Sequence, residues 1–155
     1  MSVVRAFLVA ATLSLAPFTV QAAQSDDAAR IIALVNNFRA AHGLAPVALD
    51  SKLSAAAQQH ASAMAESATF SHDKPDGNLT ERMRRAGYAF ATVTENIAAG
   101  APTPEEAEAT WEQSPPHERN LLNPSVRDAG VGHANRQGEA PNDYWCLILA
   151  QPAPP

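Results

Sequence analysis

Cysteine is almost absent from this 155-residue chain, because Cys146 is the only one. An internal disulfide is therefore excluded, and the fold must be held together by its hydrophobic core. Cys146 lies within the apolar run YWCLILA, where a small buried hydrophobic side chain is the expected role. A reactive thiolate would need exposure and a positively charged environment, so a reactive or intermolecular role is the weaker hypothesis.

Long hydrophobic runs are also scarce. The longest extends over residues 6–20 and follows Arg5. At its end Val20, Gln21 and Ala22 place small residues where a signal peptidase cleaves, which puts the cut after Ala22. This arrangement predicts a signal peptide over residues 1–22. At roughly 15 residues the run is shorter than the 20 or so that span a bilayer, so no membrane span is expected. We therefore expect an exported protein, either periplasmic or extracellular.

Positive charge is in short supply as well. Without residues 1–22 the chain carries 10 basic and 16 acidic side chains, which argues against nucleic acid or anionic lipid as the main partner. Three arginines do cluster, at Arg82, Arg84 and Arg85, and we expect them to form a solvated helix face. The remaining length fits one domain over residues 23–150, with a flexible proline-rich tail over residues 151–155.

Familiar catalytic motifs are missing. The sequence has no GxSxG, no HExxH and no phosphate-binding glycine loop. Ser71, His72 and Asp73 carry the letters of a catalytic triad, but consecutive residues do not normally align a nucleophile, a base and an orienting group. No reaction class, and no catalytic residue, follows from motifs.

Two long helices are expected in the first half of the chain. Ser25 has the character of an N-cap, and apolar residues then recur at helical spacing until Gly43. Residues 46–49 should be extended, after which Asp50 can cap a second helix. His42 is placed to bond the last carbonyls of the first helix. The apolar face of the second helix should carry Leu53, Ala56, Ala57, His60, Ala61 and Met64.

Two shorter helices and three strands should follow. Asn78 and Glu81 form a capping box for a helix that closes at Gly87. Thr103 and Pro104 start another that runs to about residue 113. Residues 129–134 and 144–150 read as a β-hairpin, and residues 90–97 as a third strand. This order predicts an α+β domain with an antiparallel sheet. The buried face of the fourth helix should carry Ala107, Thr110 and Trp111.

Polar residues at the ends of these elements are the candidates for function. His72 follows the second helix, Glu95 and Asn96 lie in the third strand candidate, and His117 follows two prolines. Two imidazoles and a carboxylate are groups that a zinc site uses, but 45 residues separate the two histidines, so the spacing favours a hydrogen-bonded polar cluster over a metal site. His60 is expected to be structural because of its buried face.

Five fragments carry a family resemblance: FSH at residues 70–72, ERMRRAGY at 81–88, TENIA at 94–98, W..SPPHERNLLNP at 111–124 and GVGHA at 130–134. Together they resemble the CAP superfamily, which includes cysteine-rich secretory proteins, antigen 5 and pathogenesis-related proteins, and most closely its bacterial SCP-like extracellular branch. The similarity covers residues 31–149. It implies an α-β-α sandwich with a three-stranded antiparallel sheet between helical layers, and a cleft lined by polar residues.

The resemblance implies specific site residues. The two histidines of the family cleft match His72 and His117, and its first glutamate matches Glu95. Ser114 occupies the position of a second glutamate, which weakens any mechanism that needs two carboxylates. Asn96 and Asn120 are expected to brace the backbone beside the cleft.

Three functions remain open. The leading hypothesis is a cleft that binds a divalent cation, such as zinc, or a small polar or peptide-like ligand, with a cell-envelope component as another possible partner. In that site His72 and His117 would hold the metal, with Glu95 acting through a water. A metal-assisted hydrolase would use Glu95 as the base on that water. A lipid or sterol carrier would need an apolar groove between helices.

The stretch SPPHERN makes a local prediction. Each proline disfavours helical geometry in the residue before it, so Ser114 and Pro115 should be extended and Pro116 should begin a short helix. His117 then lies in the first turn of that helix. The positive helix end disfavours the imidazolium form, so a mostly neutral ring is expected.

Overall fold

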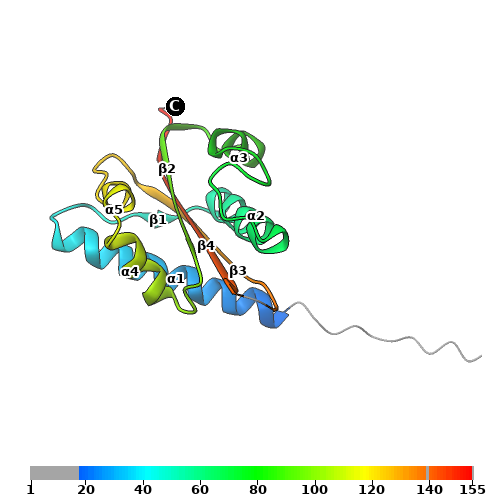
Figure 1. Ribbon diagram of the computed structural model, residues 1–155. Helices are drawn as coiled ribbons and strands as arrows, with labels where there is room; N and C mark the ends of the chain where they lie inside the picture. The colour runs from blue at the N-terminus through cyan, green and yellow to red at the C-terminus, as the bar shows by residue number, and fades with distance from the viewer. Residues whose placement is uncertain (1–17, 139, 155) are drawn as a thin grey trace, which may run out of the picture.

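The computed structural model describes residues 18–138 and 140–154 (Figure 1). Residues 1–17 of the expected signal peptide lie outside this part, and the signal peptide stays a prediction. The helices are α1 (Phe18–Ala41), α2 (Ser51–Ser67), α3 (Leu79–Ala86), α4 (Pro104–Glu112) and α5 (Pro115–Leu121), and the strands are β1 (Ala48–Leu49), β2 (Phe90–Ala99), β3 (Asp128–Asn135) and β4 (Asp143–Pro152).

The described strands form one sheet of four, in the order β1-β3-β4-β2. β3 and β4 pair as the expected antiparallel hairpin, and β2 pairs antiparallel with β4. The prediction of three strands omitted β1, which pairs in parallel with β3. The Ala48 amide donates to the Arg127 carbonyl at 2.9 Å, and the amide of Asp50, directly after β1, donates to the Ala129 carbonyl at 2.8 Å. A strand of two residues is too short to show the alternation by which strands are recognised in a sequence.

Helices cover both faces of the sheet, which confirms the expected sandwich class. Along β4, Trp145, Leu147 and Leu149 belong to the core shared with α1, α4 and α5. Cys146 and Ile148 belong to the other core, shared with α2 and α3. This alternation follows from the two-residue period of a strand, and Figure 1 shows α2 and α3 on one side of the sheet with α1, α4 and α5 on the other.

α2 packs directly against the backbone of β3 at two glycines. A Cβ built at Gly130 would meet the backbone of Leu53, and one at Gly132 would meet the backbone of Ala57. Neither neighbour can move like a flexible side chain, so a residue without Cβ is required at both positions. These are the glycines of the fragment GVGHA.

Helix ends were mostly predictable. Asp50 caps α2, Asn78 and Glu81 form the capping box of α3, and Gly87 ends α3 in the left-handed conformation. The predicted start of the first helix was wrong. α1 already begins at Phe18 and runs through Ser25, so Ser25 is not its N-cap. Helix-compatible residues such as Val20 and Ala22 precede Ser25, so its local cap signal did not decide the boundary.

Two further details differ from expectation. In α4 the buried residues are Ala107, Glu108 and Trp111, whereas Thr110 is exposed. Thr110 donates its hydroxyl to the Glu106 carbonyl at 2.8 Å instead of packing. At the C-terminus β4 extends to Pro152, so two residues of the expected tail belong to the sheet.

Candidate functional site

The candidate site surrounds β2, the strand at one edge of the sheet. Consecutive side chains of a strand point to opposite faces, so Glu95 and Asn96 face different helical layers. Glu95 contacts residues on the side of α2 and α3, while Asn96 contacts α5. Because none of the described strands lies beyond β2, side chains from both layers can approach each other around this edge.

Glu95 is the centre of the site, with only 3% of its side chain exposed. Its Oε1 accepts a hydrogen bond from His72 Nδ1 at 2.8 Å. Its Oε2 accepts from Arg82 Nη2 and from the thiol of Cys146, the latter at 3.3 Å. Burial raises the pKa of Glu95, but the hydrogen bond from His72 and the Arg82 guanidinium outweigh burial and hold it below the ordinary value.

Arg82 is the residue that sequence reasoning placed wrongly. It is 2% exposed rather than part of a solvated face, whereas Arg84 and Arg85 are exposed. Its Nη1 also donates to the carbonyls of His72 and Gly77, both at 2.8 Å. The signal available in the sequence was its neighbour Met83, which marks the apolar side of the short helix.

A buried histidine supports the chain segment that carries His72. His60 is fully buried, as expected for a structural residue. Its Nδ1 lies 2.6 Å from an oxygen of Asp76, and its Nε2 lies 3.0 Å from the Ser71 carbonyl. These bonds, together with those of Arg82, fix the backbone on both sides of His72. Cys146 is likewise buried, as predicted, and its thiol completes the environment of Glu95.

His72 and His117 are brought close together although 45 positions separate them in the sequence. Their ring centroids lie 6.4 Å apart, with the ring planes tilted by 60°. The side chain of His72 is 51% exposed, so its ring faces both Glu95 and solvent. The two predicted cleft histidines therefore belong to one cluster with Glu95, which we call the His72 cluster.

The two imidazoles have opposite tendencies to take up a proton. The hydrogen bond to Glu95 raises the pKa of His72 against the opposing effect of burial. Burial, followed by the nearby His72, lowers the pKa of His117. The pKa of His117 is thus lowered, as expected, but the cause is burial and the nearby His72 and not the positive end of the helix. His117 Nδ1 is also buried without a hydrogen-bond partner among the described residues.

The double proline positions His117 almost as expected. Ser114 is extended with φ −102° and ψ 112°, and His117 lies in the first turn of α5. Pro115 was expected to be extended but is the first helical residue, because helical φ suits proline at this position. Ser114 makes no side-chain capping bond. It offers a hydroxyl where the family has its second carboxylate.

Two asparagines attach α5 to β2. Asn96 Nδ2 donates to the His117 carbonyl at 3.1 Å. Asn120 Nδ2 donates to the Glu95 carbonyl at 3.2 Å and to Asn96 Oδ1 at 2.8 Å. Their role is to hold the backbone of both site elements in register, which explains how His117 keeps its place beside His72.

The donor set for a metal is incomplete. Among the described residues, no group of three or more His, Cys, Asp or Glu side chains is arranged to hold a metal ion. Both oxygens of Glu95 are already engaged by His72, Arg82 and Cys146. Two imidazoles alone are fewer than the three protein ligands of a typical catalytic zinc site.

The pocket found in the described part of the chain lies elsewhere. It has a volume of about 250 Å³, and none of its lining residues belongs to the His72 cluster. It is bordered by Glu66 and Arg136, whereas the lipid-carrier hypothesis requires an apolar groove. None of the described helices is long and apolar enough to cross a membrane.

Two other histidines have structural contacts. His42 Nδ1 lies 2.9 Å from the Phe38 carbonyl at the end of α1, as expected. His133 stacks on Trp145 with centroids 3.8 Å apart, and its two nitrogens each lie 2.9 Å from a carboxylate oxygen, of Asp27 and of Asp143. His133 thereby links α1 to the hairpin of β3 and β4.

Comparison with known proteins identifies relatives. The model of the cysteine-rich secretory protein family, CAP, matches residues 32–149. The protein YkwD of Bacillus subtilis is 34% identical over 123 residues, which cover 79% of this chain and 46% of that protein. The membrane protein YlbC of the same organism is 33% identical over 70% of this chain and 32% of its own length. The chain thus spans less than half the length of these two relatives.

Solved structures share the fold. An extracellular protein of Bacillus anthracis that contains an SCP domain has a TM-score of 0.77 and 28% identity, over 90% of this chain and 45% of that one. An outer surface protein of Borrelia burgdorferi has a TM-score of 0.72 over 79% of this chain and 90% of its own, and at 18% identity this likeness shows the fold alone.

Proposed function

The chain belongs to the cysteine-rich secretory protein family, the CAP family, and on that premise we propose that the His72 cluster binds a small polar or peptide-like ligand outside the cytoplasm. The observation that carries the proposal is the arrangement of His72, which is hydrogen-bonded to buried Glu95 on one side and half exposed on the other. Export is supported by the predicted signal peptide and by the extracellular relative of known structure.

The chemistry of the cluster favours a ligand with a polar or anionic group. His72 donates through Nδ1 to Glu95, which leaves Nε2 as the nitrogen available to a ligand. Protonation of His72 is favoured by Glu95, and a protonated ring offers an N–H donor and a positive charge. The pKa of His117, which lies beside it, is lowered by burial, so the pair combines an imidazole that favours the protonated form with one that favours the neutral form.

A divalent cation is the second candidate, and here the fit is partial. His72 and His117 would supply the nitrogen ligands, and Glu95 would orient His72 as carboxylates do for metal-bound histidines. The remaining ligands would have to come from solvent or from the bound molecule. Because Glu95 is held by Arg82, we derive no hydrolytic step from it, and the catalytic residues of the hydrolase hypothesis stay unassigned.

NMR titration with zinc chloride and, separately, with trialanine tests the proposal. We expect at least one probe to shift the ring signals of His72 and His117 in a saturable way. The accompanying shifts of the Glu95 and Asn96 backbone amides should disappear in the double variant His72→Ala/His117→Ala and persist in His42→Ala, a control because His42 is an exposed histidine at the end of α1. Rings that respond to neither probe at about 10 mM would refute binding at this cluster.

A further inference from the structure

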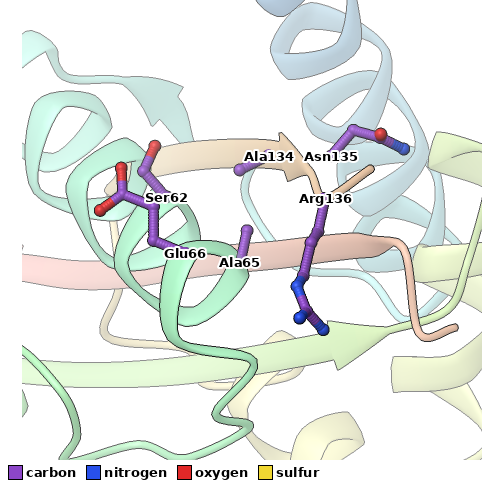
Figure 2. A pocket seen from close by; sticks show the side chains of 6 residues that line it. All are labelled: Ser62, Ala65, Glu66, Ala134, Asn135 and Arg136. Atoms are coloured by element: carbon purple, nitrogen blue, oxygen red, sulfur yellow. The ribbon is translucent and has the colours of Figure 1, made fainter. Parts of the chain in front are cut away.

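The hollow of about 250 Å³ lies between α2 and the end of β3. It is lined by Ser62, Ala65, Glu66, Ala134, Asn135 and Arg136. Figure 2 shows the three α2 residues on one side and the three residues from the end of β3 on the other. The two alanines have the smallest side chains of the set and leave the space, while the longer polar residues border it.

The walls of this hollow are fixed by hydrogen bonds outside it. Gln58 Nε2 donates to the His133 carbonyl at 2.8 Å, and Gln58 Oε1 accepts from the His133 amide at 3.1 Å. This pair of bonds ties α2 to β3 one turn before the hollow. The Arg136 amide donates to the Asn142 carbonyl at 2.6 Å, which holds the start of the connection between β3 and β4. The hollow is therefore formed by anchored backbone.

Two donors border the hollow from opposite sides, Ser62 from α2 and Arg136 from the side of β3 (Figure 2). Gln58 Nε2 lies 3.3 Å from the Ser62 hydroxyl oxygen and donates to it, so the hydroxyl proton remains available to a ligand. The guanidinium of Arg136 forms no hydrogen bond or ion pair with other described residues. A hydroxyl and a free guanidinium together suit a carboxylate, which arginine binds with two parallel hydrogen bonds.

A negative charge borders the same space. Glu66 follows Ser62 by four residues, so the two lie on one face of α2. Its carboxylate is exposed and makes no ion pair within the described part of the chain, so it is free to turn toward a ligand. A purely anionic ligand would be repelled by Glu66, and a purely cationic one by Arg136.

We propose that this hollow is a binding site for a small zwitterion, an amino acid or a dipeptide with free ends. Its carboxylate lies between Ser62 and Arg136, and its ammonium group lies at Glu66. The volume supports a ligand of this size, because pockets for drug-sized molecules hold roughly 300–1,000 Å³. The alanine floor accepts a small apolar side chain.

The test is an NMR titration with dialanine, read at the backbone amides of Ala65, Ala134 and Arg136. Acetyl-dialanine lacks the ammonium group and dialanine amide lacks the carboxylate, so each removes one proposed contact. We expect saturable shifts with dialanine alone. The variant Arg136→Gln should weaken binding about tenfold or more, since it removes a charge-assisted contact. Arg84→Gln makes the same change in an exposed residue of α3 and should leave the affinity unchanged.

Three results would overturn the zwitterion site: no saturable shift with dialanine at about 10 mM, a capped peptide that binds as tightly as dialanine, or equal loss in Arg84→Gln and Arg136→Gln. The outcome is independent of the His72 cluster. Binding there is reported by the rings of His72 and His117, none of which lines this hollow.

Discussion

His72 Nδ1 lies 2.8 Å from Glu95 Oε1, and this bond joins a loop after α2 to the edge strand of the sheet. It places a half-exposed imidazole against a buried carboxylate whose other oxygen is held by Arg82. The bond explains why the pKa shifts of the two partners are opposite, since a hydrogen bond from imidazolium to carboxylate favours the charged form of each. The fold thus favours a protonated His72 beside an ionised Glu95.

Replacement of Arg82 by methionine should strongly destabilise the protein. Glu95 and the carbonyls of His72 and Gly77 would lose their buried cation, and breaking a buried ion pair by removing one partner costs about 3–5 kcal/mol. Urea denaturation measures the loss. Arg84→Met changes an exposed arginine of the same helix and should alter stability by less than about 0.5 kcal/mol. Equal effects of the two variants would show that Arg82 carries no special role.

Gly132 should not tolerate alanine. A Cβ there would meet the backbone of Ala57, so α2 would have to move away from β3. We expect Gly132→Ala to cost on the order of 3 kcal/mol, as overpacking against a rigid neighbour does. Gly43→Ala is the control, because that position has open surroundings and only its positive φ of 72° is unfavourable, at about 1 kcal/mol. A smaller loss for Gly132→Ala than for Gly43→Ala would contradict the close packing.

Glu108 should make stability depend on pH. Burial raises the pKa of Glu108, and so do the hydrogen bond that its protonated carboxyl donates to Glu112 and the negative charge of Glu112, so that the pKa reaches about 8. Between pH 4.5 and 8 the folded state keeps a proton that the unfolded state has lost, so stability falls as pH rises through this window. Glu108→Gln should remove that fall and add on the order of 3 kcal/mol at pH 8.

Glu112→Gln separates the two causes of this shift. It removes the neighbouring charge but leaves Glu108 buried, so the decline in stability between pH 4.5 and 8 should only be partly reduced. Thermal unfolding measured across this range checks both variants. A Glu108→Gln variant whose stability declines as steeply as that of the unchanged protein would show that Glu108 is not protonated in the folded state.

Local signals in the sequence predicted the fold well, because caps and faces are set by neighbouring residues. Asp50, Asn78 and Gly87 start or end helices where expected. β1 was missed because two residues carry no period, and the start of α1 because the helix continues through the cap signal of Ser25. In α4 Thr110 was predicted to be buried and is exposed, whereas Glu108 is buried, because both lie near the boundary of the buried face.

The candidate site was predictable only in part. The family resemblance indicated His72, Glu95 and His117, and they lie together in the structure. The partners of Glu95 could not be read from the chain, since Arg82 and Cys146 are distant in sequence and meet it only through tertiary packing. Arg82 looked like one of three solvated arginines because a charged residue is rarely buried without a partner, and the partner was not visible locally.

The pH titration of the two histidine rings by NMR tests most directly the claim that His72, Glu95 and His117 form one site. The account predicts that His72 titrates above the ordinary value of 6.5 and His117 below it. Glu95→Gln should lower the pKa of His72, and His72→Ala should raise that of His117. The stability that His72 gains from its hydrogen bond to Glu95 is then full below pH 6.5 and is lost as pH rises through the folded pKa of His72. Two rings that titrate at the ordinary value and respond to neither substitution would contradict the account.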